Sequence, residues 1–140
     1  LASSVDAVRG YWDDGQIGID TPVYPTNMYG ATKCWAEALA RVYSSQHQLS
    51  CICVRLVNPF FDPAGDWHPE QLMSGISPRD AAALLARCVD VEGIDFAIVN
   101  GISRHRHGVL DWRPAQDILG FEPQDGTAVT APECAPPYHP

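Results

Sequence analysis

The feature that most constrains the fold is an apolar run at residues 49–57, LSCICVRLV, which follows a segment with helical character. An unbroken β-branched and apolar run of this length is typical of a buried strand. Asn27 is a favourable helix N-cap, and neither proline nor glycine interrupts residues 31–47. We therefore predict a helix that begins at Asn27 and ends near residues 44–46, leading into the strand.

The same alternation continues toward the C-terminus. The motif Ser77-Pro-Arg-Asp is typical of a helix start, and we predict a helix from there to about residue 89. Residues 95–99, DFAIV, predict a second buried strand, and a short helix at 114–119 is expected to end at Gly120. With a strand end inside residues 1–10, this order indicates an α/β fold with a mainly parallel sheet.

Composition excludes several classes of protein. The 140 residues carry a net charge of −8, which argues against nucleic acid or an anionic membrane surface as the main partner. No apolar run approaches the ~20 residues that a membrane helix needs. The five cysteines are an odd number without zinc-ligand spacing, so we expect no metal site, inert buried thiols and a reducing, cytoplasmic location.

The candidate chemistry lies in the pair Tyr29 and Lys33, the latter being the only lysine among nine basic residues. Residues four apart share one face of a helix, so the phenol and the ammonium are neighbours. The ammonium favours the ionised phenolate, and a phenol so placed can act as a general acid or base. Taken alone, the spacing recurs by chance on many helices, and a surface pair packed on the sheet is the alternative.

Two further residues strengthen the catalytic interpretation. Ser4 lies 25 residues before Tyr29, at the expected end of the first strand, and Asn58 lies 25 residues after Lys33, at the end of the second. Open α/β sheets place their sites at the carboxyl ends of parallel strands. The four side chains could therefore converge.

These segments resemble the extended short-chain dehydrogenase/reductases, also called the NAD-dependent epimerase/dehydratase family. The likeness rests on Ala2-Ser-Ser4, on Pro25-Thr-Asn-Met-Tyr29-Gly-Ala-Thr-Lys33 with Glu37 following, and on Val54-Arg-Leu-Val-Asn58-Pro59. It extends through Ser77-Pro-Arg-Asp to Leu119-Gly-Phe-Glu-Pro123. The combination is specific, although each piece alone is not.

The resemblance implies roles for individual residues. Tyr29 would be the acid/base at the substrate hydroxyl or carbonyl, Lys33 would hold the nicotinamide ribose, and Ser4 would hydrogen-bond the substrate oxygen. Asn58 and Pro59 would lie beside the nicotinamide of NAD or NADP. The implied function is an NAD(P)-dependent oxidoreductase or epimerase that acts on a small-molecule sugar-type substrate.

Within the family, the chain most resembles uronate dehydrogenase-like members, through Lys33-Cys-x-x-Glu37 and the ending Gly-Phe-Glu-Pro-Gln-Asp125. Those members place Asn-His after the serine, where this chain has Val5-Asp6, and an arginine after the second strand, where residues 60–76 have none. The substrate could thus be a sugar, a sugar acid or a nucleotide sugar.

The resemblance also bears on domain organisation. The glycine-rich turn with which the family binds its dinucleotide has no counterpart here, so residues 1–130 are expected to be the C-terminal part of a Rossmann-like NAD(P)-binding domain, and 131–140 a flexible proline-rich tail. Trp35, Leu39 and Val42 recur at helical spacing and predict an apolar face against the sheet or a partner helix. The family commonly dimerises through the Tyr-Lys helix. The alternative function is a non-catalytic dimerisation or binding module.

Overall fold

The computed structural model describes residues 1–59, 75–105 and 109–127. Its centre is a parallel sheet of three strands in the order β1-β2-β5, namely β1 (Ala2–Ser4), β2 (Cys51–Leu56) and β5 (Phe96–Gly101). The register pairs Ser4 with Leu56, and Leu56 in turn with Gly101. The expected α/β fold with a parallel sheet is confirmed.

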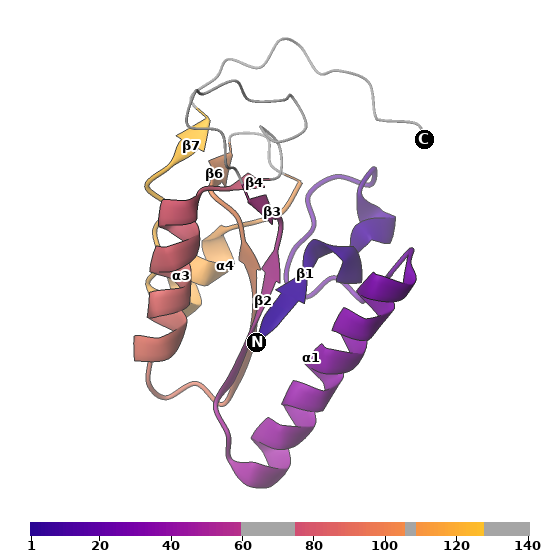
Figure 1. Cartoon of the computed structure of the whole chain (residues 1–140), viewed down its shortest axis with the longest axis vertical. Helices are drawn as coiled ribbons and strands as arrows, with labels where there is room; N and C mark the ends of the chain where they lie inside the picture. Colours follow the sequence, from indigo (N-terminus) through magenta and orange to yellow (C-terminus); the bar gives the residue numbers. More distant parts are fainter. Residues whose placement is uncertain (60–74, 106–108, 128–140) are drawn as a thin grey trace.

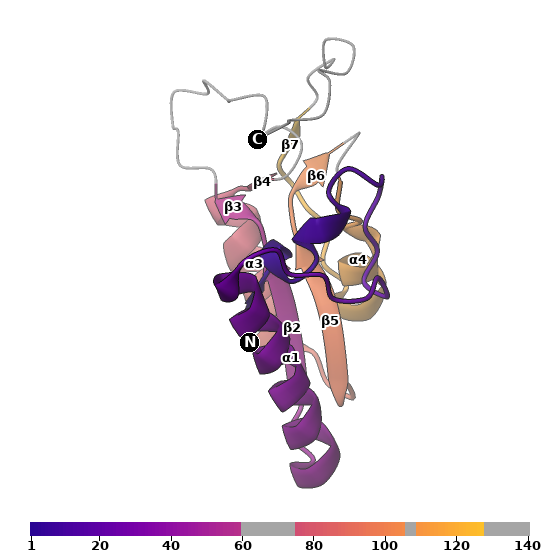
Figure 2. The same ribbon diagram turned by 90° about the vertical axis from the view of Figure 1, so that its right-hand side faces the viewer.

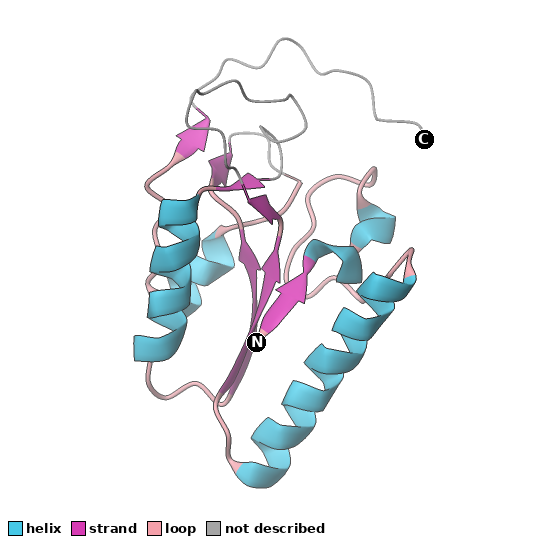
Figure 3. Ribbon diagram, in the orientation of Figure 1, coloured by secondary structure: helices cyan, strands magenta, loops and turns pink. Residues whose placement is uncertain are grey.

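Helices cover both faces of this sheet (Figures 1 and 3). Helix α1 (Met28–His47) lies on one face, while α3 (Pro78–Asp90) and α4 (Arg113–Leu119) lie on the other. The view turned by 90° shows α1 running along the length of β2 (Figure 2). The molecule is thus a three-layer α/β/α arrangement, as a Rossmann-like fold requires.

The helix boundaries follow the expected capping residues. The Asn27 side chain accepts a hydrogen bond from the Gly30 backbone N–H at 2.7 Å, and the Ser77 hydroxyl accepts one from the Asp80 N–H at 3.0 Å. Gly120 ends α4 in the left-handed conformation, with φ of 64°. Helix α1 extends to His47, slightly beyond its predicted end.

Several short segments gather beyond the carboxyl ends of the central strands, at the top of Figure 1. Two 3₁₀ turns, Val5–Ala7 and Arg9–Tyr11, follow β1. Two pairs of two-residue parallel strands complete this end of the sheet: β3 (Asn58–Pro59) with β4 (Gly75–Ile76), and β6 (Arg104–His105) with β7 (Gly126–Thr127). These turns and short strands thus lie at the edge where open α/β sheets carry their sites.

One predicted contact is wrong within the described residues. Trp35 is 67% exposed, and Leu39 and Val42 are exposed with it, so this stripe does not pack against the sheet. The residues of α1 that are buried are small or polar: Gly30, Glu37, Ala40 and Ser44. The stripe instead faces outward, and of the two predicted contacts only the one with a partner helix remains.

The core between the layers is apolar and includes Val54, Val99, Leu84 and Phe121. Cys53 is fully buried within it, and burial raises the pKa of its thiol to about 11, which fits the expectation of an inert cysteine. The expectation of buried thiols is wrong for Cys34, Cys51 and Cys88, which are only partly buried. No described helix has the length and apolarity needed to cross a membrane. The proposed tail at 131–140 and Cys134 lie outside the described residues.

Candidate active site

Tyr29 and Lys33 lie together in the first two turns of α1, at the end of the helix nearest the carboxyl edge of the sheet. The Lys33 Nζ is 5.3 Å from the centroid of the Tyr29 ring, within the range of a cation–π contact. The Tyr29 side chain is 54% exposed. Within the described part of the chain its hydroxyl has no hydrogen-bond partner, so the phenol is accessible to a bound molecule.

Lys33 also connects α1 to the first strand. Its Nζ donates a hydrogen bond to the Ala2 carbonyl at 2.9 Å, two residues before Ser4. Ser4 ends β1 and is buried, and its Oγ accepts a hydrogen bond from the Asp6 backbone N–H at 3.1 Å. Because that N–H occupies only a lone pair of Oγ, the hydroxyl proton of Ser4 is left to donate elsewhere.

The first turn of α1 lies directly on the segment that follows Ser4. A Cβ at Gly30 would lie 2.4 Å from the Asp6 carbonyl oxygen, so only glycine permits this approach. The Asn27 side-chain amide donates to the Asp6 carboxylate at 3.4 Å. Tyr29 therefore lies between Asn27 and Gly30, and both of these residues contact the turn after Ser4.

Asn58 and Pro59 stand apart from this group. Asn58 is exposed and begins β3, two residues after Leu56, which is the register partner of Ser4. The sheet thus places Asn58 at the same edge as Ser4, but no hydrogen bond among the described residues joins it to Ser4, Tyr29 or Lys33. Pro59 pairs in register with Ile76.

A buried ion pair lies one helical turn below Lys33, and the sequence reasoning missed it. Glu37 Oε1 accepts hydrogen bonds from Ser3 Oγ at 2.6 Å and from Arg55 Nε at 2.9 Å, and Glu37 Oε2 accepts one from Arg55 Nη2 at 2.9 Å. Glu37 is 4% exposed and Arg55 2%. We call Ser3, Glu37 and Arg55 the α1 clamp. Its signal in the sequence was an arginine inside an apolar strand, because a buried charge needs a partner.

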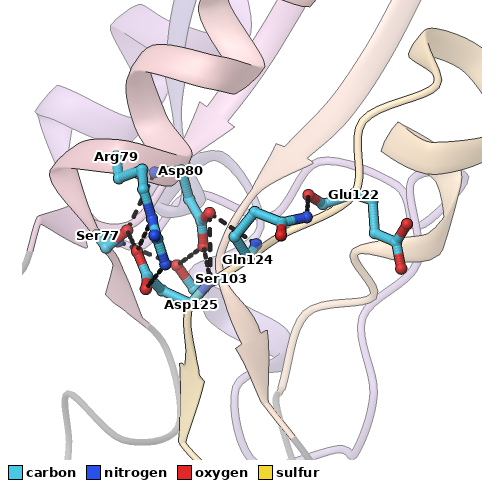
Figure 4. A network of polar contacts seen from close by, with 7 residues as sticks. All are labelled: Ser77, Arg79, Asp80, Ser103, Glu122, Gln124 and Asp125. Atoms are coloured by element: carbon cyan, nitrogen blue, oxygen red, sulfur yellow. Dashed lines mark hydrogen bonds and ion pairs between the residues drawn. The ribbon is translucent and has the colours of Figure 1, made fainter.

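A second buried carboxylate lies at the start of α3, in the segment Ser77-Pro-Arg-Asp (Figure 4). Asp80 accepts from Ser103 Oγ at 2.6 Å and from the backbone N–H groups of Gln124 and Asp125 at 2.9 and 3.1 Å. The Ser77 hydroxyl donates to the Asp125 carboxylate at 2.6 Å, and Arg79 pairs with that carboxylate. We call this group the Asp80 cluster, made up of five residues: Ser77, Asp80, Ser103, Gln124 and Asp125.

The Asp80 cluster joins α3 to the segments around β6 and β7. Its members satisfy one another, and the pKa of Asp125 is held below its usual value by the hydrogen bond from Arg79 and then by that from Ser77. In the ranges that the structure describes, no three His, Cys, Asp or Glu side chains are grouped so that they could hold a metal ion. The Asp80 cluster thus attaches α3 to the segments around β6 and β7 through contacts among its own members.

Comparison with known proteins identifies the family. Residues 2–94 match the model of a family described as "NAD dependent epimerase/dehydratase family". That match covers β1, α1, β2 and α3, and so includes Ser4, Tyr29, Lys33 and Asn58.

Individual relatives are longer than this chain. A uronate dehydrogenase of Pseudomonas putida is 29% identical over 106 residues, which are 76% of this chain and 38% of that protein. The low-salt glycan biosynthesis protein Agl12 of Haloferax volcanii is 37% identical over 81 residues, 58% of this chain and 25% of the relative. A solved structure described as a mutated uronate dehydrogenase superposes with a TM-score of 0.80 at 27% identity, covering 89% of this chain and 44% of the other. The chain thus spans less than half the length of these relatives.

Proposed function

This chain belongs to the NAD dependent epimerase/dehydratase family, and we propose that the protein carrying it is an NAD(P)-dependent oxidoreductase or epimerase acting on a sugar, a sugar acid or a nucleotide sugar. The observation that carries the proposal is the exposed Tyr29 side chain with the Lys33 ammonium 5.3 Å from its ring centroid, at the carboxyl edge of a parallel sheet. Family membership supplies the nicotinamide chemistry, and this pair supplies a proton donor and acceptor.

In the proposed reaction, Tyr29 exchanges a proton with the substrate oxygen. When a substrate hydroxyl is oxidised to a carbonyl, its proton passes to the Tyr29 phenolate oxygen, and it returns when the carbonyl is reduced. In this proposal the Lys33 ammonium, 5.3 Å from the centroid of the Tyr29 ring, places a positive charge near the phenol. The Lys33 contact with the Ala2 carbonyl fixes the ammonium in that position.

Ser4 is proposed to hold the same substrate oxygen. Its Oγ accepts from the Asp6 N–H, which orients the hydroxyl, and its own proton is left to donate to an oxygen that gains charge. A donor that is oriented before the substrate arrives needs no reorganisation during the reaction. Ser4 and Tyr29 would thus act on one oxygen from two elements of the fold.

The donor set at this edge fits the nicotinamide and its ribose, one half of the dinucleotide. Lys33 uses one N–H on the Ala2 carbonyl and keeps two for the hydroxyl groups of a ribose, and the exposed amide of Asn58 can both donate to and accept from a carboxamide. The bound cofactor would accept or deliver the hydride. Lys33, Asn58 and the backbone near Pro59 would orient it against the substrate.

The substrate class is supported by the relatives. Uronate dehydrogenase and a glycan biosynthesis protein are among the similar proteins, so a carbohydrate is the proposed substrate. The Asp6 carboxylate, which the Asn27 amide contacts at the start of α1, brings a negative charge to this end of the sheet, and such a charge disfavours a second carboxylate nearby. We therefore propose a neutral sugar or a nucleotide sugar as the substrate on equal terms with a uronate.

The direct test compares two tyrosines of α1. In the native protein, formation of reduced nicotinamide is followed with NAD or NADP and a panel of uronates, aldoses and nucleotide sugars, and nucleotide-sugar epimerisation is followed separately. Tyr29→Phe should lower kcat by about 10²- to 10⁴-fold, the usual effect of removing a general acid or base. Tyr43→Phe is the matched control, because Tyr43 is also exposed but lies near the other end of the helix. An unchanged rate in Tyr29→Phe would contradict the proposed function.

A second candidate function is a dimerisation or binding module without activity, and the outward stripe of α1 favours it. Met28 is exposed together with Trp35, Leu39 and Val42, all at helical spacing. Exposed apolar stripes of this kind mark protein contacts, and a homodimer is the partner proposed here. Trp35→Glu should convert a dimer into a monomer in sedimentation velocity, whereas a wild-type protein that sediments as a monomer would contradict the proposal.

A further inference from the structure

The α1 clamp lies between α1, which carries the candidate catalytic pair, and two strands: β1, which ends at Ser4, and β2, which leads into Asn58 of β3. Ser3 and Arg55 are register partners on neighbouring strands, so their side chains point to the same face of the sheet. Glu37 reaches both of them from α1. One carboxylate therefore joins the three elements from which the candidate site is built.

The clamp and Lys33 attach α1 to β1 at two successive levels. Lys33 and Glu37 are four residues apart and lie on the same side of the helix as Tyr29. Lys33 contacts the Ala2 carbonyl, and Glu37 contacts the hydroxyl of the next residue, Ser3. Together with the close approach of Gly30 to Asp6, these two contacts one helical turn apart restrict how the start of α1 can turn or slide on β1.

The clamp geometry is directional. Arg55 presents Nε and Nη2 in parallel to the two oxygens of Glu37, which fixes the planes of both groups as well as their distance. A buried ion pair of this kind is weak evidence for stability, because desolvation offsets most of its attraction. Its distinctive contribution is a defined orientation, which an apolar contact of similar volume does not give.

We propose that Glu37, held by Ser3 and Arg55, is a positioning residue for the reaction: it sets the placement of Tyr29 and Lys33 relative to Ser4. This inference rests on the proposed function and assigns Glu37 no contact with substrate or cofactor. A catalytic group displaced by about 1 Å can lose on the order of 10²-fold in rate, so the precision of this attachment matters for turnover.

Two variants of the native protein test the role. Arg55→Lys keeps the positive charge but cannot form the two parallel hydrogen bonds. The triple variant Ser3→Ala, Glu37→Met, Arg55→Met replaces the clamp with apolar side chains and leaves no buried charge. It is therefore expected to fold even if Arg55→Lys, which keeps a buried charge pair with poorer geometry, does not. Arg113→Lys is the matched control, because Arg113 forms the same two-bond contact with Asp111 on the surface, at 2.8 and 3.0 Å.

Both clamp variants should lose about 10- to 100-fold in kcat at temperatures well below their unfolding transitions, with a smaller change in KM for the sugar. Arg113→Lys should keep the wild-type kcat and KM. A triple variant that is folded and retains full kcat would overturn the positioning role, because the clamp would then serve the fold alone. An equal loss in Arg113→Lys would overturn it too.

Tyr29→Phe in the same assay separates this inference from the function on which it rests. If Tyr29→Phe is inactive while the folded triple variant turns over at the wild-type rate, the positioning role fails and the proposed function stands. If Tyr29→Phe turns over like the wild type, the proposed function fails and the positioning role fails with it.

Discussion

Helices α1 and α3 cover opposite faces of the sheet, and each is attached through a buried carboxylate, but the donors around the two carboxylates differ in kind (Figures 1 and 4). Glu37 on α1 is bound by an arginine side chain and a serine hydroxyl. Asp80 on α3 is bound by a serine hydroxyl and two backbone N–H groups. The Glu37 carboxylate neutralises the buried charge of an arginine. The Asp80 carboxylate instead accepts hydrogen bonds from backbone N–H groups and so attaches a distant segment of the chain to α3.

The surroundings of the two attachments differ as well. The α1 clamp lies one turn below an exposed tyrosine–lysine pair, while the Asp80 cluster binds its members to one another and to Arg79. A buried polar network is therefore not in itself a sign of chemistry. What distinguishes α1 is the reactive side chain left exposed above its network, and the predictions below test that difference.

The largest expected effect is on stability when the α1 clamp loses one side only. Glu37→Met leaves the buried Arg55 guanidinium without its counter-charge, which should cost about 3–5 kcal/mol in the free energy of unfolding. Adding Arg55→Met should recover most of that loss, because the unpaired charge is gone. Urea unfolding of the native protein measures both, and a double variant as unstable as the single one would show that the clamp is more than a charge pair.

The Asp80 cluster should respond differently when its buried carboxylate is removed and a donor is then removed as well. Asp80→Leu leaves the Ser103 hydroxyl and two backbone N–H groups without their acceptor, and we expect a loss of about 3 kcal/mol. Adding Ser103→Ala removes only one of the three donors and leaves both backbone N–H groups without an acceptor, so it should recover little. If, in the same urea titration, this double variant regained as much stability as the Glu37→Met, Arg55→Met variant does, the two regions would not differ as we propose.

A smaller effect is expected where α1 meets the turn after Ser4. Gly30→Ala places a methyl group 2.4 Å from the Asp6 backbone oxygen, and the resulting shift should cost about 1–3 kcal/mol. Gly18→Ala is the control, since nothing lies within 4 Å of a Cβ there. Thermal unfolding measures the cost for both variants, and equal melting temperatures would mean that the helix start tolerates displacement.

The smallest effect is expected on the melting temperature at low pH. The pKa of Asp125 is lowered in the folded state by Arg79 and Ser77, so its contribution to stability is present above the carboxyl's reference pKa of ~3.9 and is lost as the pH falls through the lower folded value. Melting temperatures of the wild type should therefore fall as the pH is lowered below about 4, and Asp125→Asn should fall less steeply. Parallel curves for the two proteins would contradict this role for the Asp125 contacts.

Much of the fold could be predicted because its signals are local. The caps at Asn27 and Ser77 and the left-handed Gly120 fix helix ends through hydrogen bonds between residues near in sequence. The two-residue strands β3, β4, β6 and β7 could not be predicted, since they are defined by pairing between distant segments.

The outward stripe of α1 shows where periodicity misleads. Trp35, Leu39 and Val42 mark one face of the helix, but the pattern does not say what that face meets. The buried face is built around Gly30, Glu37 and Ala40, because close packing on β1 needs small residues and because Glu37 has a charged partner there. Apolarity alone therefore points to the wrong side of the helix.

The candidate site was predictable in part. The spacing of Tyr29 and Lys33 places them on one helix face, and the structure has the ammonium near the ring. The α1 clamp was not predicted, because it depends on the register that sets Ser3 opposite Arg55. Register is a property of the sheet, and one strand's sequence does not contain it.

The most direct test of the account is a paired measurement of kcat and unfolding free energy for Tyr29→Phe and Asp80→Leu. The account predicts that Tyr29→Phe loses about 10²- to 10⁴-fold in kcat with its stability unchanged, because the hydroxyl is exposed and serves only the reaction. Asp80→Leu should lose stability and keep the wild-type kcat below its transition. A Tyr29→Phe protein with wild-type kcat would contradict the assignment of α1 as the catalytic helix.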